Sequence, residues 1–213
     1  MTPHFAADDA PIPDSRLCRR ALELVREVSP PCLCNHCLRT YRFGALIARR
    51  QGLQFDRELF FLGAVLHDLG LCERFDCGQR FEVDGADAAR AFALQEGISS
   101  EKAEALWEAV ALHTSLGIAV RKSPEAALVF LGASMDVFGL GLEELDPQAV
   151  ERVLQAHPRL DLATTLSELF VAQIRRKPHT VPFTWMTEVA RCRVPGFTYP
   201  DYDQMLAQAP FNG

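Results

Sequence analysis

The segment Leu59–Leu66 is apolar on every side and ends in two polar residues, His67 and Asp68. A helix that is apolar all round lies in the core of its protein. Removing a carboxylate from water into such a core without a partner costs roughly several kcal/mol of desolvation free energy. The chain must therefore fold around this helix and give Asp68 either a cation or several hydrogen-bond donors.

Apolar residues three and four positions apart predict helices along nearly the whole chain. Start signals precede several of them: Asp14-Ser15, Asn35 and Ser123-Pro124, while Gly70 suggests a left-handed stop after the central helix. Alternation with a period of two, which strands would need, is not convincing anywhere in the sequence. The expected fold is all-α, with helices over about 17–28, 35–50, 56–68, 88–95, 99–113, 124–138, from 146, 161–176 and 184–191.

We expect one domain over residues 1–213: a compact multi-helix bundle with its core at about 31–140, additional helices at 141–193 and an irregular tail at 194–213. The region 71–83 reads as a loop. Apolar residues of the tail could serve a partner subunit, so a homo-oligomer is possible: Phe197, Tyr199, Tyr202, Met205 and Phe211.

Charge and composition narrow the function classes. A net charge of −6 argues against binding to nucleic acid or anionic membranes. The sequence offers no run of about 18–20 apolar residues and no basic, then apolar, leader at its start, so a cytoplasmic protein is expected. Seven cysteines without an export signal favour reduced thiols over disulfides.

Two further polar residues lie within apolar helical patterns. His36 shares a stripe with Phe43 and Ile47, and Asp136 lies in the apolar run 129–138. Two imidazoles and two carboxylates that converge in a helical core would suit a divalent transition metal: imidazole suits zinc, iron and nickel, and carboxylates extend the range to manganese. Taken singly, each residue could instead be a hydrogen-bonded core residue, and Asp68 could pair with an arginine.

The cysteines offer two rival sites. Thiolates near His36 and near the His-Asp pair could hold zinc, although a second well-spaced pair is missing. Cys37 could also act as a nucleophile beside His36. The thiols concerned are Cys32, Cys34, Cys37, Cys72 and Cys77, and the remaining histidines read as surface residues: His4, His157 and His179.

The order His36, His67-Asp68 and Asp136 resembles the HD-domain superfamily of metal-dependent hydrolases over about residues 31–140. The resemblance implies that these four residues hold the ion, with zinc expected first and iron or manganese as alternatives. The segments at 35–41, 81–86 and 111–114 are similar to the cyanamide-hydratase-like branch, which implies addition of water to a small, polar, unsaturated molecule. Cys37 and Leu71 depart from the residues that are common in that branch. The chain also lacks the histidine at about 84–90 that two-metal members would use for a second ion, so a single metal is expected.

Four other residues are candidates for chemistry beside the ion. His113, at a helix end that favours its protonated form, could move a proton or orient substrate, and Glu82 is a weaker acid–base candidate. Arg39 could bind substrate or pair with Asp68 or Glu82, and Thr114 could also contact substrate.

The sequence thus predicts a metal-dependent hydrolase or hydratase acting on a small molecule, cyanamide- or nitrile-like. One alternative is a phosphohydrolase acting on nucleotides or other phosphate esters, which would need basic residues near the ligands: Arg39, Arg42 and Arg74 are candidates. The other is a non-catalytic HD-fold module with a binding or regulatory role.

Overall fold

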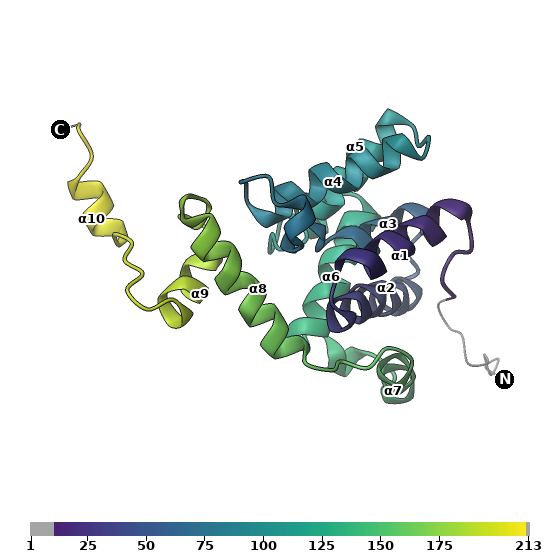
Figure 1. The fold of residues 1–213 in the computed structure, drawn as a ribbon. Helices are drawn as coiled ribbons and strands as arrows, with labels where there is room; N and C mark the ends of the chain where they lie inside the picture. Colours follow the sequence, from purple (N-terminus) through teal and green to yellow (C-terminus); the bar gives the residue numbers. More distant parts are fainter. Residues whose placement is uncertain (1–10, 212–213) are drawn as a thin grey trace. The chain divides into compact units, whose positions relative to one another are not determined.

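The computed structural model describes residues 11–211 and forms an all-helical bundle, as predicted, with no strand in that range. Ten α-helices run through these residues (Figure 1). Their bounds are α1 Arg16–Val28, α2 Pro31–Gln51, α3 Arg57–Leu66, α4 Phe81–Gln95, α5 Ser100–Ala111, α6 Pro124–Phe138, α7 Pro147–Ala156, α8 Leu162–Arg176, α9 Met186–Arg193 and α10 Tyr202–Ala207.

The chain divides into two compact units, residues 1–166 and 167–213. Whether the whole chain behaves as one domain therefore stays a prediction. None of the helices within residues 11–211 is both long and apolar enough to cross a bilayer.

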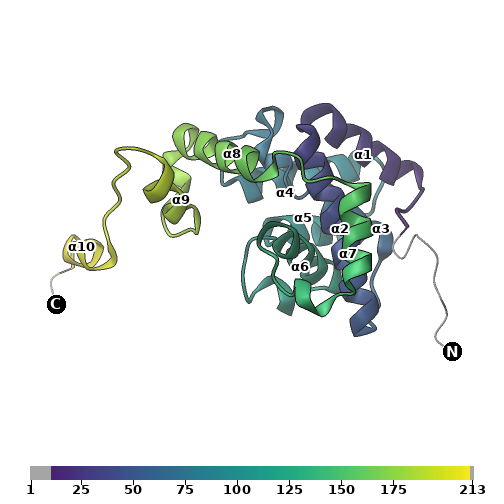
Figure 2. The ribbon, with the colours of Figure 1, turned by 90° about the horizontal axis from the view of Figure 1, so that it is seen from below.

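Helix α3 is the centre of the first unit. Every residue from Leu59 to Leu66 is buried, and α3 packs against α1, α2, α4, α5 and α6. Around it, α2 pairs with α6, and α4 with α5 (Figures 1 and 2). The all-round apolar sequence of α3 is explained by this enclosure, and the end of α3 delivers His67 and Asp68 into the core.

Two glycines of the first unit allow backbones to approach closely. A Cβ on Gly132 of α6 would lie 2.2 Å from the carbonyl oxygen of Thr40 on α2. A Cβ on Gly70 would lie 1.9 Å from the carbonyl oxygen of Phe81, the first residue of α4. Gly70 does not have a positive φ, so the left-handed helix stop predicted there is wrong. Glycine is needed because the start of α4 leaves no room for a Cβ at this residue.

Most predicted helix starts are confirmed by capping hydrogen bonds. Ser15, Ser99 and Ser123 each accept a bond from a backbone N–H of the first turn, and Asp146 does the same for α7. Two starts differ. Helix α2 begins at Pro31, so Asn35 lies inside it, and α4 begins at Phe81 rather than near 88.

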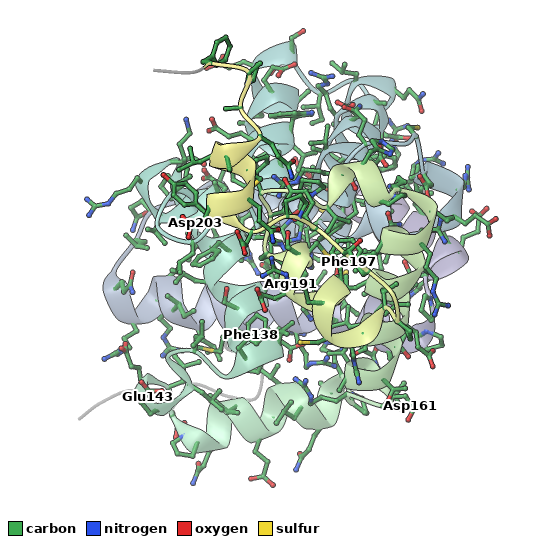
Figure 3. All side chains as sticks on the ribbon, turned by 90° about the vertical axis from the view of Figure 1, so that its left-hand side faces the viewer. Phe138, Glu143, Asp161, Arg191, Phe197 and Asp203 are labelled. Carbon is green, nitrogen blue, oxygen red and sulfur yellow. The ribbon has the colours of Figure 1, made fainter. Side chains whose placement is uncertain are left out.

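The second unit contains most of α8, then α9 and α10, where Figure 3 labels Arg191 and Asp203. The tail predicted as irregular includes helix α10, which starts with a reciprocal capping box between Asp201 and Gln204. Tyr202 and Phe211 of this tail are 70% and 86% exposed. A partner subunit for them stays a prediction.

Candidate metal centre

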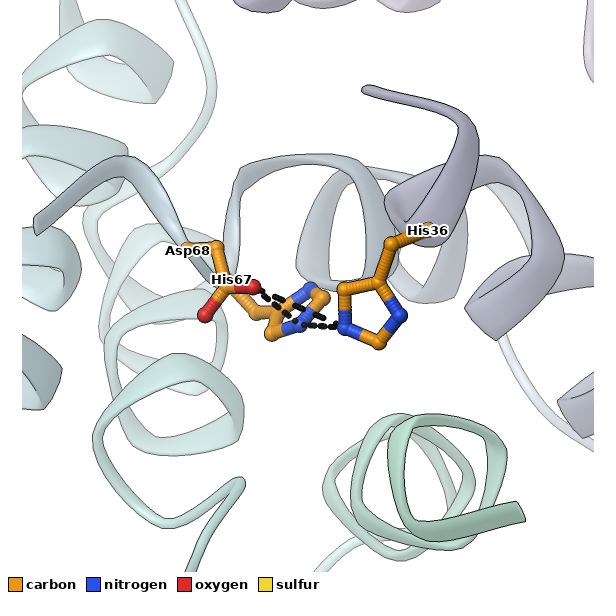
Figure 4. A group of neighbouring side chains, drawn as sticks. All are labelled: His36, His67 and Asp68. Carbon is orange, nitrogen blue, oxygen red and sulfur yellow. Dashed lines mark hydrogen bonds and ion pairs between the residues drawn. The ribbon is translucent and has the colours of Figure 1, made fainter. Parts of the chain in front are cut away.

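Three side chains from two helices meet in the core of the first unit (Figure 4). His36 projects from the second turn of α2, and His67 and Asp68 come directly after α3. All three are buried, with at most 6% of each residue exposed. This burial confirms the prediction that the three side chains lie in the core.

The ligand atoms of these residues face one another. The two Nε2 atoms lie 3.1 Å apart, and Oδ2 of Asp68 is 3.5 Å from Nε2 of His36 and 3.3 Å from Nε2 of His67. All three atoms fall within 4.8 Å of one another. Two imidazole nitrogens and one carboxylate oxygen form a donor set that suits zinc and other divalent transition metals.

Hydrogen bonds on the far side of both rings fix which nitrogen carries the lone pair. Nδ1 of His67 donates to the carbonyl oxygen of Ala64 at 2.8 Å, and Nδ1 of His36 donates to Oδ2 of Asp136 at 2.7 Å. Each Nε2 of a neutral ring is then an acceptor, so two lone pairs face each other at 3.1 Å. Such a pair requires a shared cation, either a proton or a metal ion, and the residues present therefore fit a metal.

Charge keeps Asp68 ionised inside the core. Burial alone would raise its pKa, but His67, His36 and His113 outweigh burial and hold the pKa of Asp68 well below its usual range. Burial would likewise lower the pKa of His67, and the adjacent Asp68 carboxylate reverses that, so the pKa is raised. The Asp68 carboxylate therefore favours a cation between its oxygen and the His67 ring.

Asp136 lies on the opposite side of the His36 ring. Its side chain is fully buried and receives four hydrogen bonds: Oδ1 from Nε of Arg39 at 2.7 Å and Nη1 of Arg159 at 3.1 Å, Oδ2 from Nη2 of Arg39 at 2.8 Å and Nδ1 of His36 at 2.7 Å. Burial would raise its pKa, but His36 and Arg39 lower it to about 2. The structure does not place an oxygen of Asp136 among the three ligand atoms.

In this geometry Asp136 lies behind His36, and its role as a fourth ligand stays a prediction. A carboxylate has about four acceptor positions, and all four are used here. A carboxylate behind a ligating histidine fixes the tautomer and orientation of the ring. Arg39, predicted to bind substrate or to pair with Asp68 or Glu82, is fully buried and pairs with Asp136.

His113 borders the cluster from the end of α5. Its Nδ1 donates to the carbonyl oxygen of Val110 at 2.5 Å, and its Nε2 lies 3.7 Å from Oδ1 of Asp68. Its ring is an edge-on neighbour of His67, with centroids 4.8 Å apart. Burial, followed by the charge of His67, lowers the pKa of His113 to about 4, so the protonated form expected at a helix end is wrong.

Glu82 and Thr114 meet close to His113. Glu82, 1% exposed, accepts from the Thr114 hydroxyl at 2.8 Å and from Nη2 of Arg80 at 2.9 Å. Burial would raise the pKa of Glu82, but Arg80 and His113 lower it. The structure thus brings the two predicted residues together, and their chemical roles stay predictions.

The rival cysteine sites find little support. Among residues 11–211, the groups able to hold an ion through three close ligand atoms comprise His36, His67 and Asp68, with no thiol among them. Burial, together with the negative charge of Asp68, raises the pKa of Cys37 well above its usual value, which disfavours a thiolate nucleophile. All seven cysteines are free.

The group of ligand atoms formed by His36, His67 and Asp68 includes neither His157 nor His179. His179 is exposed, as predicted, whereas His157 is half-buried, and its carbonyl oxygen accepts a bond from Arg39 at 2.8 Å. His4 lies outside the described residues.

The profile of the HD domain matches residues 33–156, more than half of the chain. The chain belongs to the HD-domain family. The matched HD domain contains the buried cluster and Asp136, and together they indicate a metal-dependent hydrolase. A search of curated proteins found no match.

Sequence reasoning missed Arg159, which lies just after the matched residues. It donates to both the carbonyl oxygen and the carboxylate of Asp136 from the turn after α7. An arginine between two helices carries no local signal of such a contact, which exists only once α7 has packed on α2.

Proposed function

We propose that this HD domain is a hydrolase or hydratase that adds water to a small, neutral, polar molecule, cyanamide- or nitrile-like, with the help of one divalent metal ion. The observation that carries the proposal is the convergence of two Nε2 lone pairs and one carboxylate oxygen within 4.8 Å. His36, His67 and Asp68 would hold the ion, and zinc fits this donor set best. When bound, such an ion supplies Lewis acidity and activates water near neutral pH.

His113 is the group best suited to move a proton. With Nδ1 donating to a carbonyl oxygen and a pKa of about 4, the ring is neutral at pH 7 and Nε2 is an acceptor. That atom lies 3.7 Å from Oδ1 of Asp68, so it would be close to an ion that Asp68 held. His113 would accept a proton from water as its oxygen attacks the substrate.

Glu82 and Thr114 would orient the substrate beside His113. The Thr114 hydroxyl donates to Glu82, so its oxygen can accept a hydrogen bond from an N–H or O–H of a substrate. Glu82 is held by two donors and keeps Thr114 in place. These roles require a small molecule, since both residues lie close to the buried cluster.

The charges around the cluster favour a neutral substrate over a phosphate ester. Arg39 and Arg159 are bound to Asp136, and Arg80 is bound to Glu82. Arg74, one of the cations suggested for a phosphate, is paired with Glu27 at 2.9 Å on an exposed part of the surface. A phosphate bound by Arg39, Arg80 or Arg159 would have to draw that arginine away from a carboxylate.

Substrate screening with the zinc-loaded protein tests this proposal. Cyanamide and small nitriles are assayed beside nucleotides and simple phosphomonoesters, with the parent and His113→Gln. Turnover of a nitrile-type compound by the parent, reduced at least tenfold in His113→Gln at equal metal content, is the expected result. Turnover of phosphate esters alone would overturn the substrate class, and a metal-loaded protein inert toward every compound would favour a binding module.

A further inference from the structure

The turn after α7 reaches the far side of the metal cluster. Arg39 donates from Nη1 to the carbonyl oxygens of His157 at 2.8 Å and Pro158 at 3.1 Å. Asn35 also donates to Pro158, at 2.9 Å. Residues 157 and 158 are therefore tied to α2 within one turn of His36.

Arg159 continues this connection into α6. Its Nη1 donates to the backbone carbonyl oxygen of Asp136, which lies in the last turn of α6 and has no partner further along the helix. The same nitrogen lies 3.1 Å from Oδ1 of Asp136. Arg159 is 40% exposed, whereas Arg39 and Asp136 are fully buried in their side chains.

The backbone of the turn is held in an uncommon conformation. Leu160, directly after Arg159, has a φ of 50°, although it is not glycine and the residue is 60% exposed. A bulky residue in the left-handed region is strained, and such strain persists where surrounding contacts fix the backbone. The hydrogen bonds of residues 157–159 are contacts of this kind, on the residues directly before Leu160.

We propose that Arg159 is a positioning residue for the metal site: it holds Asp136 in place, and Asp136 in turn holds the His36 ring with its Nε2 toward His67 and Asp68. Without Arg159, Oδ1 of Asp136 loses one of its two donors, and the end of α6 loses its link to the turn. The carboxylate can then rotate, and the His36 ring with it. This inference rests on the proposed metal site but not on any particular substrate.

Arg159→Met tests the inference, because methionine keeps much of the apolar stem and removes the donors. Arg159→Lys is the conservative variant, since its ammonium can restore one charged contact. Arg19→Met is the matched control: it also removes an arginine–aspartate pair, with Asp14 at 2.5 Å, from an exposed position away from the cluster.

Two readouts are needed. Zinc affinity is measured by competition with a chelator, and the imidazole ¹⁵N–¹H signals of the metal-free protein report the Nδ1–H proton of His36. We expect Arg159→Met to bind zinc at least tenfold more weakly, in the range seen when a carboxylate behind a ligand is disturbed, and to lose or shift the His36 signal. Arg159→Lys should recover part of both, and Arg19→Met should match the parent.

An Arg159→Met protein with parental zinc affinity and an unchanged His36 signal would overturn the inference. If the parent itself binds no zinc, the proposed function fails, yet the His36 signal of the metal-free protein still decides whether Arg159 positions the ring. A loss of thermal stability in Arg159→Met with both readouts unchanged would make Arg159 purely structural.

Discussion

Gly132→Ala should loosen both the fold and the metal site, because α2 and α6 meet backbone to backbone at this residue. The new Cβ would lie 2.2 Å from the carbonyl oxygen of Thr40, and the backbone atom cannot rotate away. The helices must separate by roughly 1 Å, and overpacking of this kind costs about 1–3 kcal/mol. Alanine returns up to about 1 kcal/mol through its better helix propensity, so we expect a net loss of about 1 kcal/mol.

The same displacement should reach the cluster. Gly132 lies one turn before Asp136, and Thr40 follows Arg39, whose bonds to Asp136 measure 2.7 and 2.8 Å. A shift of roughly 1 Å would stretch those bonds beyond the usual range for hydrogen bonds. Zinc affinity should therefore fall together with stability.

Urea unfolding, followed by circular dichroism, measures the loss in stability. Gly63→Ala is the matched control: it too lies in a buried helix, but its Cβ would meet the Cγ2 methyl of Val129 at 2.9 Å, a side-chain atom that can move. Gly63→Ala should cost less. If Gly132→Ala unfolds at the parental urea concentration, or is less affected than Gly63→Ala, the close approach of α2 and α6 is not what requires glycine here.

Two other predictions concern the turn after α7. Leu160→Asn should raise the free energy of unfolding by about 0.5–1 kcal/mol, since asparagine tolerates a positive φ and the exposed leucine contributes little packing; a urea midpoint below that of the parent would contradict the strain. The pKa of His157 is lowered to about 4 by its burial and by nearby arginines, so its contribution to stability is complete above about pH 6.5 and is lost as the pH falls toward 4. The free energy of unfolding should fall between pH 7 and pH 4.5, and this fall should be about 1–3 kcal/mol smaller in His157→Gln than in the parent. Equal falls in the two proteins would refute the lowered pKa of His157.

Much of the fold could be predicted because strong local signals agreed with burial. The continuous apolar run of α3 predicted its central position, and the serine and proline at the start of α6 set that boundary. The start of α2 was misplaced because Asn35 resembles a cap, whereas Pro31 supplies the first turn and Asn35 turns its amide to Pro158. The early start of α4 was hidden by buried acidic residues, which interrupt the apolar spacing.

The candidate site was predictable in its residues and less so in their arrangement. A buried aspartate and two histidines in apolar helices required partners, and His36, His67 and Asp68 do meet. The position of Asp136 behind His36 depends on how α6 packs on α2, which spacing along one helix cannot give. Asp136 is satisfied by arginines that lie 97 residues before it and 23 residues after it, so only the folded chain reveals that arrangement.

The central claim is that His36, His67 and Asp68 hold one divalent ion. Elemental analysis of the parent and of Asp68→Asn, both dialysed after incubation with zinc, iron or manganese, tests it most directly, because asparagine keeps the shape of the side chain and removes its charge. We predict about one equivalent of metal in the parent, with zinc retained best, and little in the variant. A parent that retains none of the three metals, or a variant that retains as much as the parent, would contradict the claim.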